Sequence, residues 1–380
     1  MRKRTIRLGD VTDNFDSLRK PVKKTERVAG EFPYYGASGV VDHVDNYIFD
    51  GEYLLIAEDG ENLRSRSTPI AFMAAGKFWV NNHAHVVRGN HLADTRFLNY
   101  LLAITDISGY LTGSAQPKLS RASMDSIQIS LPDLDTQRAI AEVLGALDDK
   151  IAANNRLVET ASQLSNALFK ESLADSAATE AKISEVCAVV ARGITPKYSE
   201  AEDSMIVLNQ KCVRQQRISL KQARRTELSK VREEKILLHN DVLVNSTGQG
   251  TLGRVARWTS PERVTADSHI TILRFDPSLV NPVCGGFAVL RSEKVITAMA
   301  EGSTGQTELS RRELGKLALL LPPAEVQDSL GQKLSEITEY SDALTQENQR
   351  LSGTRDALLP LLMSGKLRVR EAEAVVKDVL

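Results

Sequence analysis

Apolar and polar positions follow two periods along this chain, and each period appears twice. Short runs in which apolar residues alternate with polar ones, broken by Gly, Asn and Asp, occupy residues 53–60, 78–89 and 241–250. Such runs predict short strands joined by long loops. Two later stretches place apolar residues four and three positions apart, which is typical of long coiled-coil helices. The first seam contains Ile140, Leu144, Leu147, Ile151, Asn154, Val158, Ala161, Ser165 and Leu168, and the second contains Leu330, Leu334, Ile337, Ser341, Leu344, Asn348, Leu351 and Leu358.

The two predicted helices are expected to pack on each other. Each would contain roughly 35 residues and be about 50 Å long, which is more than a domain of this size can cover. Each seam carries one asparagine, Asn154 or Asn348. A buried seam asparagine costs stability and typically fixes the register of paired helices, which suits a spacer of defined length. Pro360 and Gly365 are predicted to end the second helix.

The chain contains an internal duplication. GSAQPKLSR at 113–121 recurs as GSTGQTELSR at 302–311, and NNHAHVVR at 81–88 resembles DSHITILR at 267–274. A constant offset pairs Leu119/Leu309, Ser120/Ser310, Arg121/Arg311, Leu131/Leu321, Pro132/Pro322 and Gln137/Gln327. The loops between these segments differ, so the sequence predicts two similar scaffolds with dissimilar inserts.

These patterns predict an α+β fold of a pseudo-twofold, duplicated kind. Two mixed α/β domains are separated by two long antiparallel coiled-coil helices. The predicted parts are a domain at 1–132, a helix at 133–176, a domain at 177–322, a helix at 323–366 and a tail at 367–380.

Composition places the chain among ordinary globular proteins. Hydrophobic residues make up 42% and charged residues 26% of its 380 residues. No apolar run approaches the roughly 18 residues that a membrane span needs, and the basic N-terminus lacks the apolar core of a secretory signal, so a cytoplasmic protein is expected. Cys187, Cys212 and Cys284 are widely separated and are read as reduced thiols.

The net charge of −1 hides a local basic excess. Residues 183–322 hold 20 Lys and Arg against 15 Asp and Glu, and residues 211–235 hold nine basic and three acidic residues. A charge run is often only a solvated face, but in this duplicated context it favours contact with DNA phosphates. The candidates are Lys197, Lys211, Arg214, Arg217, Lys221, Arg224 and Arg225, together with Arg64 and Arg66 in the segment RSRST.

Catalytic motifs are incomplete. GQGTLGRV at 248–255 lacks the Lys-Ser/Thr of a phosphate-binding loop, and no methyltransferase motif is found. His83 and His85 alternate on a predicted strand without a third metal ligand, which favours hydrogen bonding over a metal site. We predict no catalytic residue and no metal site.

At this point the chain resembles the specificity subunits of type I restriction-modification systems over nearly its whole length. The first half carries the resemblance in residues 32–60, 76–89 and 113–151. The second half carries it in GSTGQTELSRRELGKLALLLPP at 302–323 and DALLPLLMSGKLRV at 356–369, with one extra residue, Gly305, at the junction.

The resemblance implies that each domain is a target recognition domain that reads half of a bipartite site in double-stranded DNA. The helices would set the gap between the half-sites and dock two modification subunits, which would bind S-adenosylmethionine and methylate adenine. Restriction subunits that use ATP and Mg would translocate and cut unmethylated DNA. This chain itself would bind no cofactor and would act in the cytoplasm of a bacterium or archaeon.

By position, the resemblance assigns six residues to junction loops near DNA and five to helix surfaces that dock partners. The junction residues are Gln116, Lys118 and Ser120 in the first half, with Gln306, Ser310 and Arg311 in the second. The docking residues are Leu157, Leu164, Phe169, Leu351 and Leu358.

Three other functions remain open from the residues. A standalone DNA-binding regulator would need no docking surface, so unburied Leu157, Leu164 and Phe169 would argue against it. A coiled-coil adaptor would show no salt-dependent DNA affinity. A self-sufficient nuclease would be built on Asp133, Asp148 and Lys150, although the last two lie inside the predicted helix.

Overall fold

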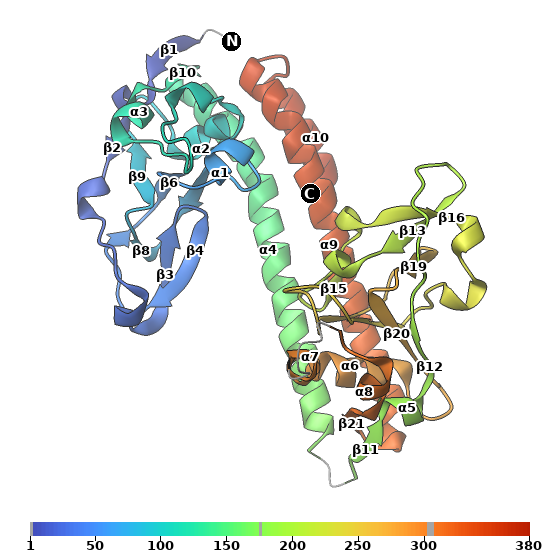
Figure 1. The fold of residues 1–380 in the computed structure, drawn as a ribbon. Helices are drawn as coiled ribbons and strands as arrows, with labels where there is room; N and C mark the ends of the chain where they lie inside the picture. The colour runs from blue at the N-terminus through green and yellow to red at the C-terminus, as the bar shows by residue number, and fades with distance from the viewer. Residues whose placement is uncertain (1–2, 175–176, 302–307) are drawn as a thin grey trace. The chain divides into compact units, whose positions relative to one another are not determined.

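The structure, a computed structural model, describes residues 3–174, 177–301 and 308–380 (Figure 1). It separates into two compact units. The first unit comprises Met1–Asn154 and Gln346–Leu380, and the second comprises Asn155–Thr345. The β-rich part of the first unit, up to residue 132, is called the first domain below, and residues 177–322 are called the second domain.

Two four-stranded sheets form the first domain. One has the order β2-β9-β6-β7 and is antiparallel throughout; the other has the order β4-β3-β8-β5. The strands are β1 (Arg4–Arg7), β2 (Thr12–Asn14), β3 (Ala29–Gly36), β4 (Gly39–Val44), β5 (Phe49–Asp50), β6 (Tyr53–Ala57), β7 (Ala71–Ala74), β8 (Lys77–Val80), β9 (Ala84–Gly89) and β10 (Gln128–Leu131). Helix α2 (Thr95–Ile104) packs on β6, β7 and β9, and the short helices are α1 (Asn62–Ser65) and α3 (Arg121–Ser126).

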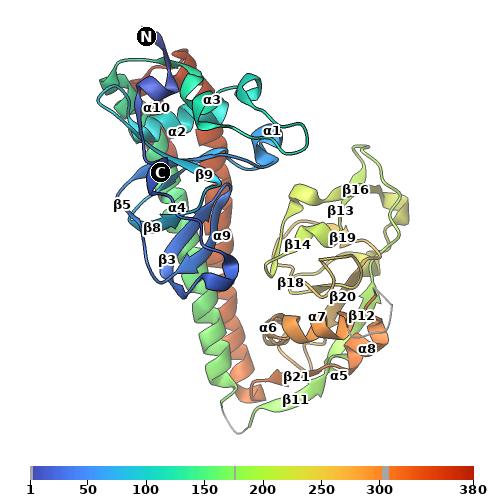
Figure 2. The ribbon, with the colours of Figure 1, turned by 60° about the vertical axis from the view of Figure 1, so that its left-hand side comes forward.

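The second domain has a four-stranded antiparallel sheet, β12-β20-β17-β18, and a three-stranded sheet, β16-β13-β19. Helix α6 (Pro282–Arg291) packs on β18 and β20 (Figure 2). The strands are β11 (Thr179–Lys182), β12 (Cys187–Arg192), β13 (Ser204–Leu208), β14 (Val213–Arg214), β15 (Arg217–Ile218), β16 (Arg224–Glu227), β17 (Val242–Asn245), β18 (Val255–Arg257), β19 (Val264–Ala266), β20 (Ile270–Phe275) and β21 (Ala318–Leu321). The other helices are α5 (Ile183–Val186), α7 (Glu293–Glu301) and α8 (Arg311–Lys316).

The two domains share one topology. Strand β3 pairs antiparallel with β4 and parallel with β8, and β13 pairs in the same way with β16 and β19. A two-stranded ribbon, β1 with β10 or β11 with β21, closes each domain just before a long helix. The duplication predicted from short sequence matches therefore extends to the main arrangement of strands, although β5 and the β14-β15 ribbon each occur in one domain only.

Both long helices form as predicted. Helix α4 spans Leu134–Ser172 and α9 spans Ala324–Ser364. Within the first unit Asp148 bonds Arg355 and Asn154 bonds Asn348, so the paired segments run antiparallel. Within the second unit Phe169 and Leu334 share one core. Every predicted seam residue is buried or half-buried, which confirms the two long paired helices.

One prediction about the C-terminal end was wrong. Pro360 lies inside α9, and the helix continues to Ser364 before Gly365, at φ +77°, ends it. A proline deletes one helical N–H, but the other backbone bonds of that last turn hold. The predicted tail contains a further helix, α10 (Val369–Val379), whose Ala372 and Val376 are buried in the first unit's core. None of the helices in the described ranges is long and apolar enough to cross a membrane.

Candidate nucleic-acid interface

In each domain the end of the junction loop, at residues 118–120 or 308–310, lies beside the residue that directly follows a core strand, β6 or β17. Leu119 N–H donates to Glu58 O at 2.8 Å in the first domain, and Leu309 N–H donates to Ser246 O at 2.9 Å in the second. Bridges join Lys118 to Asp59 and Glu308 to Thr247. The two junction loops are therefore held at equivalent positions.

A serine ends each junction loop and begins the next helix. Ser120 Oγ accepts a bond from Ser123 N at 3.2 Å, and Ser310 Oγ accepts one from Glu313 N at 3.1 Å. This is the ordinary N-cap arrangement, and it occupies part of the hydrogen-bonding capacity of both hydroxyls. Arg311, directly after the cap, is exposed. Gln306 lies outside the described residues.

The first junction loop is also fixed from its outer side. Arg64 donates to Gly113 O at 2.7 Å and to Ser114 O at 3.1 Å. Gly113 has φ +84°, and a Cβ there would lie 2.2 Å from Gln116 O, so this turn requires glycine. Gln116 is exposed on the loop held by these contacts.

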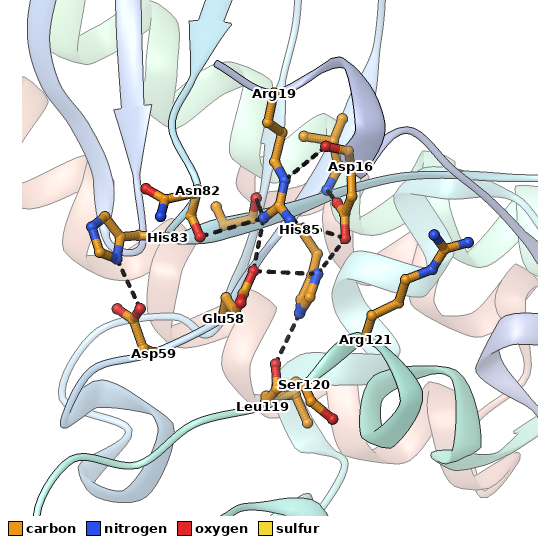
Figure 3. A network of polar contacts seen from close by, with 12 residues as sticks. Asp16, Arg19, Glu58, Asp59, Asn82, His83, His85, Leu119, Ser120 and Arg121 are labelled. Carbon is orange, nitrogen blue, oxygen red and sulfur yellow. Dashed lines mark hydrogen bonds and ion pairs between the residues drawn. The ribbon is translucent and has the colours of Figure 1, made fainter. Parts of the chain in front are cut away.

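Beneath the loop lies a polar network centred on His85 (Figure 3). His85 Nδ1 is 2.6 Å from Asp16 Oδ2, and its Nε2 is 2.9 Å from Leu119 O. Arg19 Nη1 donates to Glu58 Oε2 and to Ala84 O, both at 2.8 Å. This buried network ties the junction loop to β9 and to the segment that follows β2.

Both ring nitrogens of His85 lie beside oxygen atoms. A carbonyl oxygen only accepts, so Nε2 carries a proton toward Leu119 O. Burial on its own would raise the pKa of the Asp16 carboxyl, but hydrogen bonds and the charges of His85 and Arg19 hold that pKa below its ordinary value. Asp16 is therefore ionised at neutral pH and accepts from Nδ1. Both ring nitrogens of His85 are thus engaged by its own domain, and the residue serves the fold.

The exposed rim of the first junction is cationic. Lys118 is about half exposed, with its Nζ 3.4 Å from Glu58 Oε1. Arg121 follows the Ser120 cap with a side chain 60% exposed. Exposed Lys and Arg beside a rigid loop are the usual partners of backbone phosphates.

The second junction lines a groove of about 820 Å³. Its walls include Glu308, Ser310 and several cationic side chains, which are Arg192, Arg311, Arg312 and Lys316. Arg192 Nη2 donates to Glu308 Oε1 at 2.7 Å and to Leu309 O at 2.9 Å, and burial lowers its pKa. These hydrogen bonds fix Arg192 on one wall of the groove. The charged side chains of Arg311 and Lys316 are exposed.

A second cavity of about 350 Å³ lies in the same domain. Lys211, Arg224, Asp267 and His269 contribute to its lining, and Arg224 lies over the ring of Tyr198 at 4.5 Å. The Asp267 side chain is buried, and burial raises its pKa. Cationic donors and a carboxylate acceptor thus share one small polar cavity.

Comparison with known proteins finds relatives of this chain. Residues 3–162 match the family model of the type I restriction modification DNA specificity domain. A putative type I restriction enzyme specificity subunit of Haemophilus influenzae is 41% identical over 141 residues, which is 37% of this chain and 36% of that protein. A type I restriction enzyme specificity subunit of Methanocaldococcus jannaschii is 19% identical over 96% of this chain and 93% of that protein. Residues 3–162 are thus similar to the DNA specificity domain of type I restriction-modification systems.

The fold agrees with that family. The crystal structure of a type I restriction-modification S subunit from M. genitalium has a TM-score of 0.64 at 14% identity and covers 95% of this chain and 96% of that one. Two β-rich domains joined by two long helices are thus common to both chains. The strongest sequence matches are shorter: they span 36%, 50% and 37% of three relatives from H. influenzae and Mycoplasma pneumoniae.

The basic residues predicted in the second domain do not form one surface. Lys211 and Arg224 line the smaller cavity. Arg225 instead donates from Nε to Ser204 Oγ at 2.7 Å, and Arg217 donates to Thr345 Oγ1 on α9 at 3.3 Å. Lys197 pairs with Glu227 at 2.8 Å, whereas Arg214 and Lys221 are exposed. Sequence spacing alone could not separate structural from exposed cations.

The Arg66 side chain bonds to backbone carbonyls of its own domain. Arg66 has φ +52° and donates to Leu102 O at 3.3 Å and Thr105 O at 2.5 Å. Partial burial of the guanidinium lowers its pKa, although the residue as a whole is exposed. Arg66 therefore closes the C-terminal end of α2.

The predicted docking residues differ in their exposure to solvent. Leu157 is 44% exposed and Leu164 is 49% exposed on α4. Phe169, expected at the surface, is fully buried and stacks on Phe287 with ring centroids 6.0 Å apart. Leu351 and Leu358 are core residues of the first unit. The expected exposure of Phe169 is therefore wrong, whereas Leu351 and Leu358 are buried in the seam where their spacing placed them.

The residues of the nuclease alternative enter separate structural contacts. Asp133 accepts from Thr136 N as the cap of α4, and Lys150 lies 3.5 Å from Glu347. Asp148 accepts from Tyr100 OH at 2.5 Å and from Arg355 Nη1 at 2.6 Å. No group of three or more His, Cys, Asp or Glu that could hold a metal ion occurs in the described part of the chain.

Sequence reasoning missed the groove residues Arg192, Arg312 and Lys316. Arg192 is far in the sequence from Arg312 and Lys316, which both lie on α8, and no local pattern joins it to them. The constant offset that pairs Arg121 with Arg311 was the available signal, because it pointed to the residues just after each cap.

Proposed function

We propose that this chain is the DNA specificity subunit of a type I restriction-modification enzyme and supplies sequence recognition to partners that perform the chemistry. Each recognition domain, 1–132 or 177–322, would read one half of a bipartite site in double-stranded DNA. The observation that carries the proposal is the repetition of one two-sheet topology, each copy leading through a ribbon into one of two long paired helices. Two similar readers on a stiff spacer suit two half-sites at a fixed gap.

On this proposal the junction loops face DNA. Gln116, Lys118 and Ser120 would contact one half-site, and Gln306, Ser310 and Arg311 the other. Exposed Lys118, Arg214, Lys221 and Arg311 are suited to phosphates, while Lys211 and Arg224 beside Asp267 are suited to base edges, because that cavity offers both donors and an acceptor. Arg64, Arg66, Arg217 and Arg225 would support these surfaces from within the protein, and Lys197 would act at the rim.

The spacer helices, 133–176 and 323–366, would also dock two modification subunits. Exposed Leu157 and Leu164 lie seven residues apart, two helical turns along one face of α4, and support a docking surface there. S-adenosylmethionine would bind to those partners, and ATP and Mg would bind to restriction subunits. The complex would act in the cytoplasm, where the host DNA lies.

The test maps methylated adenines in a host that encodes the chain, before and after deletion of its gene. We expect methylation at one split sequence with a fixed gap, lost on deletion and restored by the wild-type gene. Unchanged methylation after deletion would reject the proposal and favour a standalone DNA-binding regulator.

A second measurement addresses direct DNA contact. Purified chain, with its partners where they co-purify, is titrated against duplex DNA at several salt concentrations. A reader that contacts several phosphates loses affinity steeply as salt rises. Affinity that is independent of salt would instead favour a protein-binding adaptor.

A further inference from the structure

One side-chain arrangement outside the predicted DNA contacts occurs in both domains. His83 directly precedes β9, and His269 directly precedes β20. Asn81 Oδ1 accepts from His83 N at 2.8 Å, and Asp267 Oδ1 accepts from His269 N at 2.9 Å. The same side-chain turn thus positions a histidine at the start of the same strand in each domain.

The surrounding backbone bonds are equivalent as well. Asn81 N–H donates to Tyr35 O at 3.0 Å, and Asp267 N–H donates to Leu208 O at 2.8 Å. The carbonyl of His83 accepts from Glu58 N, and that of His269 accepts from Ser246 N, both at 2.9 Å. Each histidine therefore lies beside the strand end that holds its junction loop.

Each imidazole is anchored through one nitrogen only. His83 Nδ1 is 2.8 Å from Asp59 Oδ2 (Figure 3), and His269 Nδ1 is 2.7 Å from Thr247 Oγ1. Both side chains are exposed, and no described residue bonds Nε2 of either one. His85, in contrast, is buried with partners for both nitrogens.

The exposed histidine is repeated in both domains, but the buried one is not. His85 serves the fold, and the aligned segments place Thr271, not histidine, at its position in the second domain. The exposed histidine is present in both copies although the neighbouring loops differ. A purely structural need would favour the buried residue, so the exposed pair points to a ligand common to both domains.

We propose that His83 and His269 contact DNA through Nε2, one in each half-site, with Asp59 and Thr247 as positioning residues; this rests on the proposed function. Neighbouring cations suit that ligand. The exposed Lys118 lies opposite Asp59 in a backbone bridge, and Lys211 and Arg224 share a cavity with His269. The Asp59 carboxylate accepts from Nδ1 of His83, so Nε2 is an acceptor in the neutral ring and a donor in the charged one. The Thr247 hydroxyl can donate or accept, so His269 can present either polarity. The two positions can therefore discriminate different base edges.

The experiment uses the host of the methylation map. A strain lacking the gene is complemented with wild type, His83→Ala or His269→Ala, at limiting expression. We expect about tenfold less methylation of cognate sites, consistent with the loss of one good DNA contact. Relaxed sequence at one half-site, a different half-site for each variant, assigns base contact. Uniform loss without relaxation assigns phosphate contact, which also supports the proposal.

Controls exclude loss of folding as the cause. His91→Ala and His239→Ala remove exposed histidines from the first and second units and should methylate as wild type. Asp59→Asn and Thr247→Ser keep an oxygen for Nδ1 and should retain most activity, whereas Asp59→Ala and Thr247→Val should not. Chain abundance is measured in each strain, and thermal melting of the purified variants should be unchanged.

Two outcomes separate this inference from the proposed function. If deletion of the gene abolishes methylation while both His→Ala variants restore it fully, with unchanged sequence, the inference is wrong and the proposed function stands. If deletion changes nothing, the proposed function has failed.

Discussion

Asn154 donates a hydrogen bond from Nδ2 to Oδ1 of Asn348 across 2.9 Å, so the single asparagine of each helix seam meets the other. The same Nδ2 donates to Glu347 Oε2 at 2.7 Å. Asn154 is almost fully buried, and its Oδ1 has no hydrogen-bond partner among the described residues. This polar layer costs stability but is satisfied best in one register, because a shifted register would bury the amides against leucines.

We expect the double variant Asn154→Leu with Asn348→Leu to raise the free energy of unfolding by about 1–2 kcal/mol and to loosen the register. Urea unfolding measures the first effect. The methylation map measures the second, as sites with more than one gap length. Asn348→Leu alone is the control, and it should destabilise because Asn154 loses a partner. A less stable double variant with one unchanged gap would contradict this account.

The Asp16–His85 pair predicts a pH-dependent contribution to stability. The pKa of Asp16 is lowered in the folded state, so its contribution is fully present above the unfolded pKa of about 3.9 and is lost as pH falls through the folded value. Asp16→Asn should reduce the free energy of unfolding at pH 7 by about 1–3 kcal/mol. The difference from wild type should shrink below about pH 4.

Denaturant unfolding between pH 3 and pH 8 checks this expectation. Asp13→Asn, an exposed carboxylate in the neighbouring strand, is the matched control and should change little. A difference between wild type and Asp16→Asn that does not vary with pH would show that the carboxylate charge is not the cause.

Gln137 and Gln327 occupy equivalent positions, so replacing either one should lower the free energy of unfolding by a similar amount. Buried Gln137 accepts from Asp94 N at 3.0 Å and donates to Leu92 O and Pro132 O, tying the start of α4 to the first domain. Gln327 accepts from Asn281 N at 2.9 Å and donates to Pro322 O at the start of α9. Either Gln→Leu change leaves buried backbone groups unpaired and should cost about 2–4 kcal/mol.

Thermal and urea unfolding of the two variants measure these losses. Gln163→Leu and Gln349→Leu alter exposed glutamines on the same helices and should stay within about 0.5 kcal/mol of wild type. If Gln137→Leu were equally mild, the glutamine would not be the link between domain and helix.

Sequence was sufficient where a repeating pattern determines burial. The 4,3 spacing located both helices and every seam residue, because one face of a long helix must be buried. The internal duplication predicted two similar domains. The matched Gln137 and Gln327 are equivalent buried residues that connect each domain to its long helix. The pairing of Asn154 with Asn348 was not predictable, since register depends on contacts between segments nearly 200 residues apart.

Single side chains were harder to place. Arg224 and Arg225 are neighbours in a strand, so they point to opposite faces, and only Arg224 lines the cavity. Phe169 fell outside the predicted seam, yet α6 of the second domain covers it. Charge and hydrophobicity indicate what a residue can do, while the tertiary neighbours decide whether it faces solvent.

The exposed leucines of α4 give the sharpest test of assembly. Leu157→Asp with Leu164→Asp places two charges on a surface that is already solvated, so the free energy of unfolding should change by less than about 1 kcal/mol. Docking of an apolar partner face should be lost, because binding would bury both carboxylates without partners. Val295→Asp, at an exposed apolar position on α7, is the matched control. Co-purification of the modification subunit with the Val295→Asp variant but not with the double variant would locate docking on this face of α4, whereas co-purification with both would place the partner elsewhere.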